Sequence, residues 1–157
     1  MAEHPEGIEA ETQGNPTPQY DATASDLALS KALGRAAGRA DRKSSSLLKR
    51  YGLTPAQFNA LEALYHDGPL TMRQVTEKTF STPGNMTVVV RNLERDGLLS
   101  RTRNPADARS QLLGLTDAGR RKVAEIWPAH NAQLRELFTA LSPAERQSLA
   151  ALLDKIG

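Results

Sequence analysis

Apolar residues recur at intervals of three and four positions over most of this chain, and this spacing predicts a mainly helical protein. We expect helices near residues 25–51, 55–67, 72–79, 82–96, 117–140 and 143–156. Two short segments, 98–103 and 110–115, are predicted to form strands around the turn 104–109, and Leu70 can supply a third short strand. The expected order is helix, helix, strand, helix, helix, strand, strand, helix, helix.

The predicted helix boundaries coincide with capping signals. Thr54, Thr82 and Ser142 each stand before a proline, so a capping hydroxyl precedes a residue that suits the first helical turn. Glu145 stands three positions after Ser142, where it can complete a capping box. Gly97 stands where a glycine ends a helix, after about residue 96.

Each long predicted helix has an apolar stripe that we expect to be packed. The stripes are Leu29, Leu33, Ala36, Ala40, Leu47 and Tyr51; Phe58, Leu61, Leu64 and Tyr65; Met86, Val89, Val90 and Leu93; Val123, Ile126, His130, Leu134, Leu137 and Leu141; and Leu149, Leu152, Leu153 and Ile156. In the 117–140 helix the alternating gaps of three and four residues indicate packing in a bundle or against a second subunit.

Charge is distributed unevenly in the chain of 157 residues, although its net charge is only +2. The first 26 residues contain six acidic residues and no Lys or Arg, so all 20 basic residues lie in the remainder. We expect residues 1–22 to form a disordered acidic tail, and the basic remainder, 23–157, to form a single domain that suits a polyanionic partner.

The stretch 69–115 combines two short helices, a tight connection and a basic hairpin. In that order the second helix can enter the major groove of DNA, and the hairpin can reach a flanking minor groove. The pattern therefore predicts a mainly α protein, a winged helix-turn-helix with a small antiparallel sheet, that binds double-stranded DNA.

The segment NMTVVVRNLERDGLLSRTRNPADARSQLLGLTDAG, residues 85–119, resembles the signature of the MarR family of bacterial transcriptional regulators. The resemblance covers roughly 25–156. It implies a homodimer that binds palindromic operator DNA, often as a repressor released by a small aromatic or phenolic ligand. It also implies a winged helix-turn-helix at about 53–117 and dimerisation helices at about 25–51 and 117–156.

The chain departs from the family pattern inside the predicted recognition helix. Many relatives carry Arg where Val88 stands and Asp where Arg91 stands. The operator sequence therefore cannot be carried over from a relative.

Residues early in a recognition helix face base edges, and the DNA-contact candidates here are Ser81, Thr82, Pro83, Gly84, Asn85, Thr87 and Arg91. Asn85 can pair with adenine, and Pro83 and the Thr87 methyl group can meet a thymine methyl group. The alternatives are that Thr82 is only a helix cap and that Asn85 and Thr87 are only helix surface.

The hairpin supplies Arg101, Arg103, Asp107 and Arg109 as further DNA-binding candidates. The guanidinium of Arg109 suits a narrow, strongly negative minor groove. The family resemblance implies that Asp107 braces Arg109 or the adjacent backbone, and the alternative is a turn-forming Asp. Arg73 and Gln74 begin the preceding helix and are candidate phosphate contacts, whereas Arg95 is expected only to be solvated.

Phe58, Tyr65, Trp127 and His130 are candidates to line an effector pocket between the dimerisation region and the DNA-binding lobe. The alternative is that these rings belong to the hydrophobic core, where such residues are found more often. The absence of Cys excludes thiol chemistry, and we expect no metal, no cofactor and no enzymatic site. Without an apolar run long enough to span a bilayer, we expect a soluble cytoplasmic protein that does not bind membranes. The alternative function is a winged-helix protein–protein interaction module with little DNA binding.

Overall fold

The structure is a computed structural model that describes residues 24–107 and 109–156. The predicted acidic tail, 1–22, and Ala108 at the tip of the hairpin lie outside the described residues. Two units are distinguished, 1–34 and 35–157, and their boundary falls inside the first helix. The described part of the first unit is entirely helical, and the sheet and all other helices belong to the second unit.

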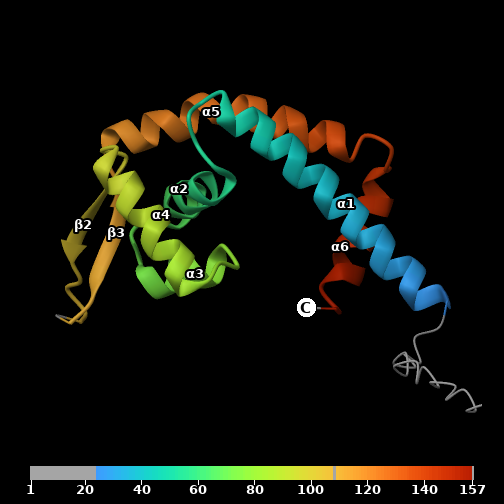
Figure 1. Cartoon of the computed structure of the whole chain (residues 1–157), viewed down its shortest axis with the longest axis horizontal. Coiled ribbons are helices and arrows are strands. Elements are labelled where there is room, and N and C mark those ends of the chain that lie inside the picture. The colour runs from blue at the N-terminus through green and yellow to red at the C-terminus, as the bar shows by residue number, and fades with distance from the viewer. Residues whose placement is uncertain (1–23, 108, 157) are drawn as a thin grey trace, which may run out of the picture. The chain divides into compact units, whose positions relative to one another are not determined.

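The order of the elements confirms the predicted order (Figure 1). The elements are α1 (Ala24–Lys49), α2 (Pro55–Asp67), β1 (Leu70–Thr71), α3 (Met72–Lys78), α4 (Pro83–Arg95), β2 (Leu99–Arg103), β3 (Gln111–Leu115), α5 (Asp117–Leu137) and α6 (Pro143–Leu153). Both α5 and α6 end earlier than the apolar spacing predicts. The guanidinium of Arg146 donates to the carbonyl oxygens of Leu141 at 3.0 Å and Phe138 at 2.8 Å, which fixes the corner between α5 and α6.

The helices begin at the predicted caps because a hydroxyl satisfies a backbone N–H that has no partner inside the helix. Thr54, Thr82 and Ser142 are the N-caps of α2, α4 and α6, and each is followed by proline. The predicted capping box of Ser142 and Glu145 is present. At the other end of α4, Gly97 has φ 70°, a left-handed conformation that glycine adopts without a steric penalty.

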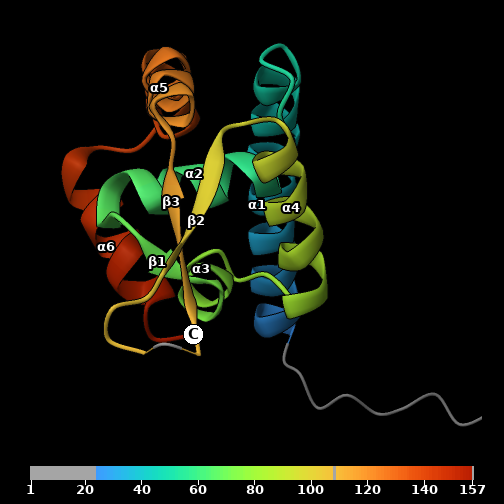
Figure 2. The same ribbon diagram turned by 90° about the vertical axis from the view of Figure 1, so that its left-hand side faces the viewer.

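The sheet has three antiparallel strands in the order β1-β3-β2, and Leu70 lies opposite Leu113. Pairing of β2 with β3 runs from Leu99 opposite Leu115 to Arg103 opposite Gln111. Figure 2 shows this hairpin extending away from the region where α4 ends. The central position of β3 ties the hairpin to the rest of the second unit.

The core forms where α2, α4 and α5 meet the sheet. Its fully buried members include Phe58 and Leu61 of α2, Met86 and Leu93 of α4, and Ile126 of α5. Figure 1 shows α2 in the middle of this group. Burial of the four predicted stripe residues of α4 confirms the interior face of that helix. Its opposite side is therefore held outward.

Several residues of the predicted stripes are exposed, contrary to the expectation that they pack. Tyr65 is 39% exposed, because it follows Leu64 by one residue and so lies about 100° further around the helix. Leu29 and Leu33 of α1 and Leu134 of α5 are also exposed, and no residue of α6 is buried. The apolar stripes therefore include residues that lie outside the core of a single chain.

A close contact joins the end of α4 to the start of α5. The Thr116 hydroxyl donates to the carbonyl oxygen of Gly97 at 2.7 Å, and the Thr116 backbone N–H donates to the carbonyl oxygen of Leu98 at 3.2 Å. A Cβ atom at Gly119 would lie 2.0 Å from the carbonyl oxygen of Leu98, so only glycine allows this approach. The contact fixes where β2 and the hairpin begin relative to α4.

Candidate nucleic-acid interface

The outward side of α4 carries most of the predicted recognition residues. Thr82, Pro83, Gly84, Asn85, Thr87 and Arg91 are exposed, and Ser81 is half-buried. Because Met86, Val89, Val90 and Leu93 anchor the opposite side, this surface has a fixed orientation. The structure therefore brings the seven predicted residues together on one helix and its cap.

Local hydrogen bonds order the beginning of α4. The Thr82 hydroxyl accepts from the backbone N–H of Asn85 at 3.3 Å, which makes it the N-cap. The Asn85 amide donates to the Ser81 hydroxyl at 3.0 Å, and the Thr87 hydroxyl donates to the Pro83 carbonyl at 2.8 Å. These bonds hold the side chains near the surface while leaving the Thr87 methyl group and the second amide hydrogen of Asn85 unused.

Val88 also lies on the outward side and is 45% exposed. An apolar side chain thus lies on the exposed side of this helix. Arg91 is exposed as well, and among the described residues its guanidinium forms no ion pair.

The predicted phosphate contacts at the start of α3 already have local partners. Arg73 pairs with Glu77, with 2.7 Å between Nε and Oε1, and the hydrogen bond to Glu77 raises the pKa of Arg73. The Gln74 side chain accepts from the Thr71 backbone N–H at 2.9 Å and completes a capping box. Gln74 thus has a structural role, while the Arg73 side chain is still 87% exposed.

The three wing arginines are placed differently. Arg101 forms two hydrogen bonds to the Glu94 carboxylate, at 2.7 and 3.0 Å, and this pair is only about one-third exposed. Arg103 at the end of β2 and Arg109 in the turn are exposed. Neither forms an ion pair with another described residue. Arg101 ties the hairpin to α4, and the other two guanidinium groups face solvent.

Hydrogen bonds within the turn give the tip of the hairpin a defined shape. The Asp107 carboxylate accepts from the backbone N–H of Arg109 at 3.0 Å, and the Asp107 carbonyl accepts from Ser110 at 3.0 Å. The Asn104 amide donates to the Ser110 hydroxyl at 2.8 Å. Asp107 therefore contacts the adjacent backbone in an Asx-turn, a geometry that fits both the bracing role implied by the family resemblance and the alternative of a turn-forming Asp.

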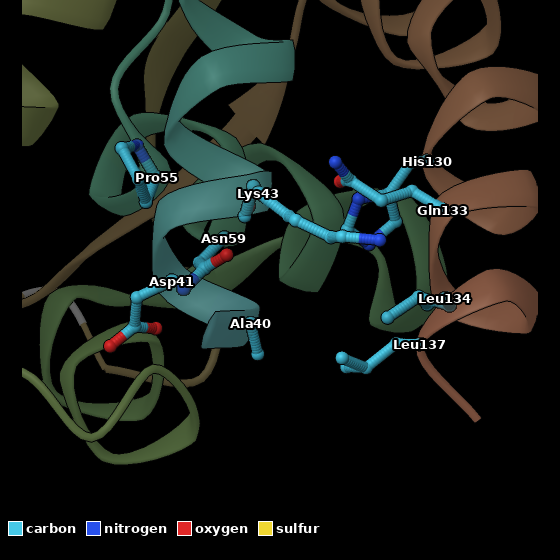
Figure 3. A pocket seen from close by; sticks show the side chains of 10 residues that line it. Ala40, Asp41, Lys43, Pro55, Asn59, His130, Gln133, Leu134 and Leu137 are labelled. Carbon is cyan, nitrogen blue, oxygen red and sulfur yellow. The ribbon is translucent and has the colours of Figure 1, made fainter. Parts of the chain in front are cut away.

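A separate cavity of about 170 Å³ lies between the end of α1, the start of α2 and the second half of α5 (Figure 3). Its lining residues are Ala40, Asp41, Lys43, Ser44, Pro55, Asn59, His130, Gln133, Leu134 and Leu137. Lys43 extends toward the α5 side and pairs with Glu136 at 2.8 Å. The Nδ1 atom of His130 is buried and has no hydrogen-bond partner among the described residues. A buried polar atom without a partner is costly, so this nitrogen is suited to a bound molecule.

Only His130 of the four predicted pocket residues lines this cavity. Phe58 is fully buried and packs against His130 in a tilted arrangement, with 4.9 Å between ring centroids. Trp127 lies 6.1 Å from His130, and Tyr65 is exposed beside His66. The four rings therefore form a row along α2 and α5 and do not enclose one space.

Among the described residues no cluster of His, Asp and Glu has the arrangement of a metal site. No helix in the same part of the chain combines the length and apolar character required to cross a bilayer.

Comparison with known proteins decides the family. Residues 51–110 match the sequence profile of the MarR family. YkoM of Bacillus subtilis (strain 168), an uncharacterized HTH-type transcriptional regulator, is 38% identical over 69% of this chain and 71% of its own length. The chain belongs to the MarR family. This membership confirms the resemblance seen in residues 85–119.

Solved structures of MarR regulators show the same fold. The structure of Bordetella bronchiseptica BpsR, whose DNA binding is regulated by 6-hydroxynicotinic acid, is 30% identical and has a TM-score of 0.66. It covers 80% of this chain and 98% of its own. Sco3205, a MarR family transcriptional regulator from Streptomyces coelicolor solved in complex with DNA, is 24% identical and has a TM-score of 0.80. That match covers 90% of this chain and 91% of Sco3205.

MarR membership makes this chain one of a family of DNA-binding transcriptional regulators, and it confirms the predicted winged helix-turn-helix. Sequence reasoning missed Lys43, Asn59 and Gln133 of the cavity, because polar residues on separate helices carry no spacing signal. It also missed Phe80, because the spacing of apolar residues does not indicate that a single aromatic side chain is 96% exposed.

Proposed function

We propose that this MarR-family protein is a homodimeric, sequence-specific regulator that binds pseudo-palindromic double-stranded DNA. We further propose that it acts as a repressor and that a small aromatic molecule releases it. The observation that carries the DNA-binding mode is the pairing of an anchored helix with an exposed polar side and a neighbouring hairpin whose tip presents Arg109.

In this proposal α4 lies in the major groove with its N-terminal residues at the base edges. Asn85 pairs with adenine, whereas Pro83 and the Thr87 methyl group contact thymine methyl groups. Gly84 lets the backbone approach closely, and Ser81 and Thr82 position the start of the helix. Arg91, further along the exposed side, contacts a phosphate.

The wing contributes through residues with distinct roles. Arg109 enters the minor groove, and Asp107 holds the backbone that presents it. Arg103 and Arg73 contact phosphates. Because Arg101 is committed to Glu94, we assign it the role of holding the hairpin against α4. Gln74 supports the start of α3 through its capping box.

A mobility-shift titration tests this mode against the alternative of a protein interaction module. The probe is a duplex that the purified protein selects from a randomised library. Each phosphate contact releases a counterion, so affinity should fall with a log–log slope of about −0.9 per contact as salt rises. Failure to select any duplex over random DNA would favour the interaction module.

The exposed apolar positions of α1, α5 and α6 support the homodimer. Leu152 is 57% and Ile156 65% exposed, and α6 contains no buried residue. A helix with such a surface gains stability by packing against another chain. Two copies related by a two-fold axis would present two α4 helices to one duplex, which is the reason for expecting a pseudo-palindrome.

The cavity around His130 supports a small-molecule effector. Its wall combines the aliphatic Leu134 and Leu137 with the polar groups of Lys43, Gln133 and His130. An aromatic ring with an acidic or phenolic substituent could therefore contact the leucines and hydrogen-bond the buried Nδ1 atom. The regulation of BpsR by 6-hydroxynicotinic acid supports this ligand class. Because α1, α2 and α5 all line the cavity, a ligand there can change the spacing of the recognition helices.

Release requires that the ligand bind the DNA-free conformation more tightly, with a coupling free energy of roughly 1–3 kcal/mol. A panel of hydroxylated aromatic acids, beginning with 6-hydroxynicotinic acid, should include one that weakens duplex binding. His130→Phe keeps a ring beside Phe58 and removes the unpartnered nitrogen. This variant should bind duplex normally and lose the response, and an unchanged response would place the effector elsewhere.

A further inference from the structure

Phe80 stands out in the turn between α3 and α4. Its side chain is 96% exposed, although it is a large aromatic residue. Its φ angle is 49°, and no other non-glycine residue among those described has a positive φ. The ring thus gains almost nothing from burial in the chain, while the backbone adopts a conformation unfavourable to a bulky side chain.

The hydrogen bonds around Phe80 explain why the backbone is held in this way. The N–H of Phe80 donates to the carbonyl of Glu77 at 3.2 Å, and the N–H of Ser81 donates to that of Thr76 at 3.1 Å. This pair of bonds forms a Schellman motif at the end of α3, with Phe80 in the left-handed position where glycine is usual. Glycine would close the turn without strain, so the turn itself does not require the aromatic ring.

The position of the turn indicates what the ring does instead. Phe80 immediately precedes Ser81 and Thr82, and it lines a hollow between Asn85 and Met86 at the start of α4 and Ala56 and Asn59 of α2. It also lines a second hollow with Glu62, Asp67 and Lys78, of which the last two pair at 3.2 Å. Two carboxylates against one lysine make this second hollow less suited to the phosphate backbone than the side of Ser81 and Thr82.

We propose that Phe80 is a specificity-determining residue that contacts the C5-methyl group of a thymine at the edge of each half-site. The inference rests on the proposed placement of α4 in the major groove. A phenyl ring cannot hydrogen-bond, and the thymine methyl group is the apolar group that base pairs display in that groove. An exposed, strained aromatic beside the polar residues of α4 is suited to that contact. Strain that the fold does not require is a known mark of functional positions.

The test combines one variant with one chemical change in the DNA. Phe80→Gly removes the ring and relieves the left-handed strain, which offsets the greater freedom of glycine in the unfolded chain, so its denaturation midpoint should not fall below that of the wild-type protein. The probe is a duplex selected by the wild-type protein from a randomised library. Deoxyuridine replaces each thymidine in turn, which removes a single methyl group.

At one thymine per half-site, deoxyuridine should lower wild-type affinity about fourfold, the loss that corresponds to one buried methyl group. Phe80→Gly should bind the thymine duplex no more tightly than the wild-type protein binds the duplex with deoxyuridine at that position. The affinity of Phe80→Gly should not change when deoxyuridine is placed at that one position. Other thymines should affect both proteins equally, because Pro83 and Thr87 are unchanged. If the effect of deoxyuridine also depends on the Phe80 ring at a second, symmetry-related thymine, the result would support one contact per subunit.

Three results would overturn the inference. The first is a wild-type protein that is insensitive to deoxyuridine at every position, or a Phe80→Gly variant that keeps the full sensitivity. The second is a lower denaturation midpoint for Phe80→Gly, which would make the ring structural. The third is a Phe80→Gly variant that dimerises more weakly in sedimentation but binds the duplex with unchanged affinity, which would place the ring against a second copy of the chain. If the wild-type protein selects no duplex, the proposed DNA-binding function fails together with the inference. The three results above leave DNA binding itself intact, although insensitivity to deoxyuridine at every position would also remove the thymine contacts assigned to Pro83 and Thr87.

Discussion

At the scale of single residues, Arg109 is the side chain from which we expect the largest effect on DNA binding. Arg109→Ala should weaken operator binding strongly and leave the fold intact, because the residue is exposed on the turn and contributes nothing to the core. Loss of a charged hydrogen bond costs roughly 1.5–3 kcal/mol, or ~3–6 kcal/mol for two subunits if the losses add. Arg109→Lys should recover part of this loss, because an ammonium fits a narrow groove less well than a flat guanidinium.

The matched control is Arg95→Ala in the same mobility-shift series. Arg95 is also exposed and pairs with Asp96 at 3.0 Å, late in α4 and away from its N-terminal residues. Its removal deletes the same charge without deleting the proposed groove contact. If Arg95→Ala weakens binding as much as Arg109→Ala, the wing does not read the minor groove.

Gly119 gives a second prediction at this scale, now for stability. Gly119→Ala should destabilise the protein by about 1–3 kcal/mol or more, because the new methyl group would lie against the Leu98 carbonyl oxygen. Chemical denaturation measures the change. Gly84→Ala adds the same methyl group where no atom lies within 4 Å and should be nearly neutral. Equal effects of the two substitutions would contradict the close approach.

Sequence reasoning at the residue scale succeeded where one side of a helix meets one core. The burial of Met86, Val89, Val90 and Leu93 follows from their spacing. It failed for Tyr65 because helical spacing defines a side only to within about one residue. Gly119 was visible as part of a family motif, but the carbonyl oxygen that requires it comes from Leu98, and only the folded chain brings the two together.

At the scale of elements, caps predicted where helices begin better than apolar spacing predicted where they end. Thr54, Thr82, Thr116 and Ser142 all cap the expected helices, because capping depends only on the next three residues. The residues predicted to form the pocket, apart from His130, do not line the observed cavity. The wall of that cavity comes from three helices, and spacing within one helix cannot show how three helices are placed together.

The capping box of α6 predicts a pH dependence. Hydrogen bonds from the Ser142 backbone N–H and then its hydroxyl lower the pKa of Glu145. Since the folded-state pKa lies below the unfolded value, the stabilisation is complete above about pH 4.3 and is lost as pH falls through the folded-state pKa. The protection factors of α6 amides, corrected for the intrinsic pH dependence of exchange, should therefore fall on acidification, and Glu145→Gln should remove this pH-dependent part.

The control for this experiment is Glu125→Gln, which removes a carboxylate paired with Lys122 in α5. This variant should keep the acid-induced fall of the protection factors in α6. An identical pH profile for Glu145→Gln and the wild-type protein would show that the capping box does not stabilise α6.

At the scale of the whole molecule, we predict a homodimer in solution. The exposed apolar residues of α6, together with Leu134 of α5 and Phe138 directly after α5, form a surface that a second chain can bury. Sedimentation at micromolar concentration should give the mass of two chains. Leu152→Glu places a charge in this surface and should shift the equilibrium toward the monomer. A wild-type monomer at that concentration would contradict the assignment of α6 to dimerisation.

The central claim is that two copies of α4 and its wing read one duplex. Hydroxyl-radical footprinting on the selected duplex tests it most directly, because the method maps contacts along both strands. The account predicts two protected half-sites about one helical turn apart, related by two-fold symmetry, with additional minor-groove protection outside each half-site that disappears in Arg109→Ala. A single unsymmetrical protected region, or flanking protection that Arg109→Ala retains, would contradict it.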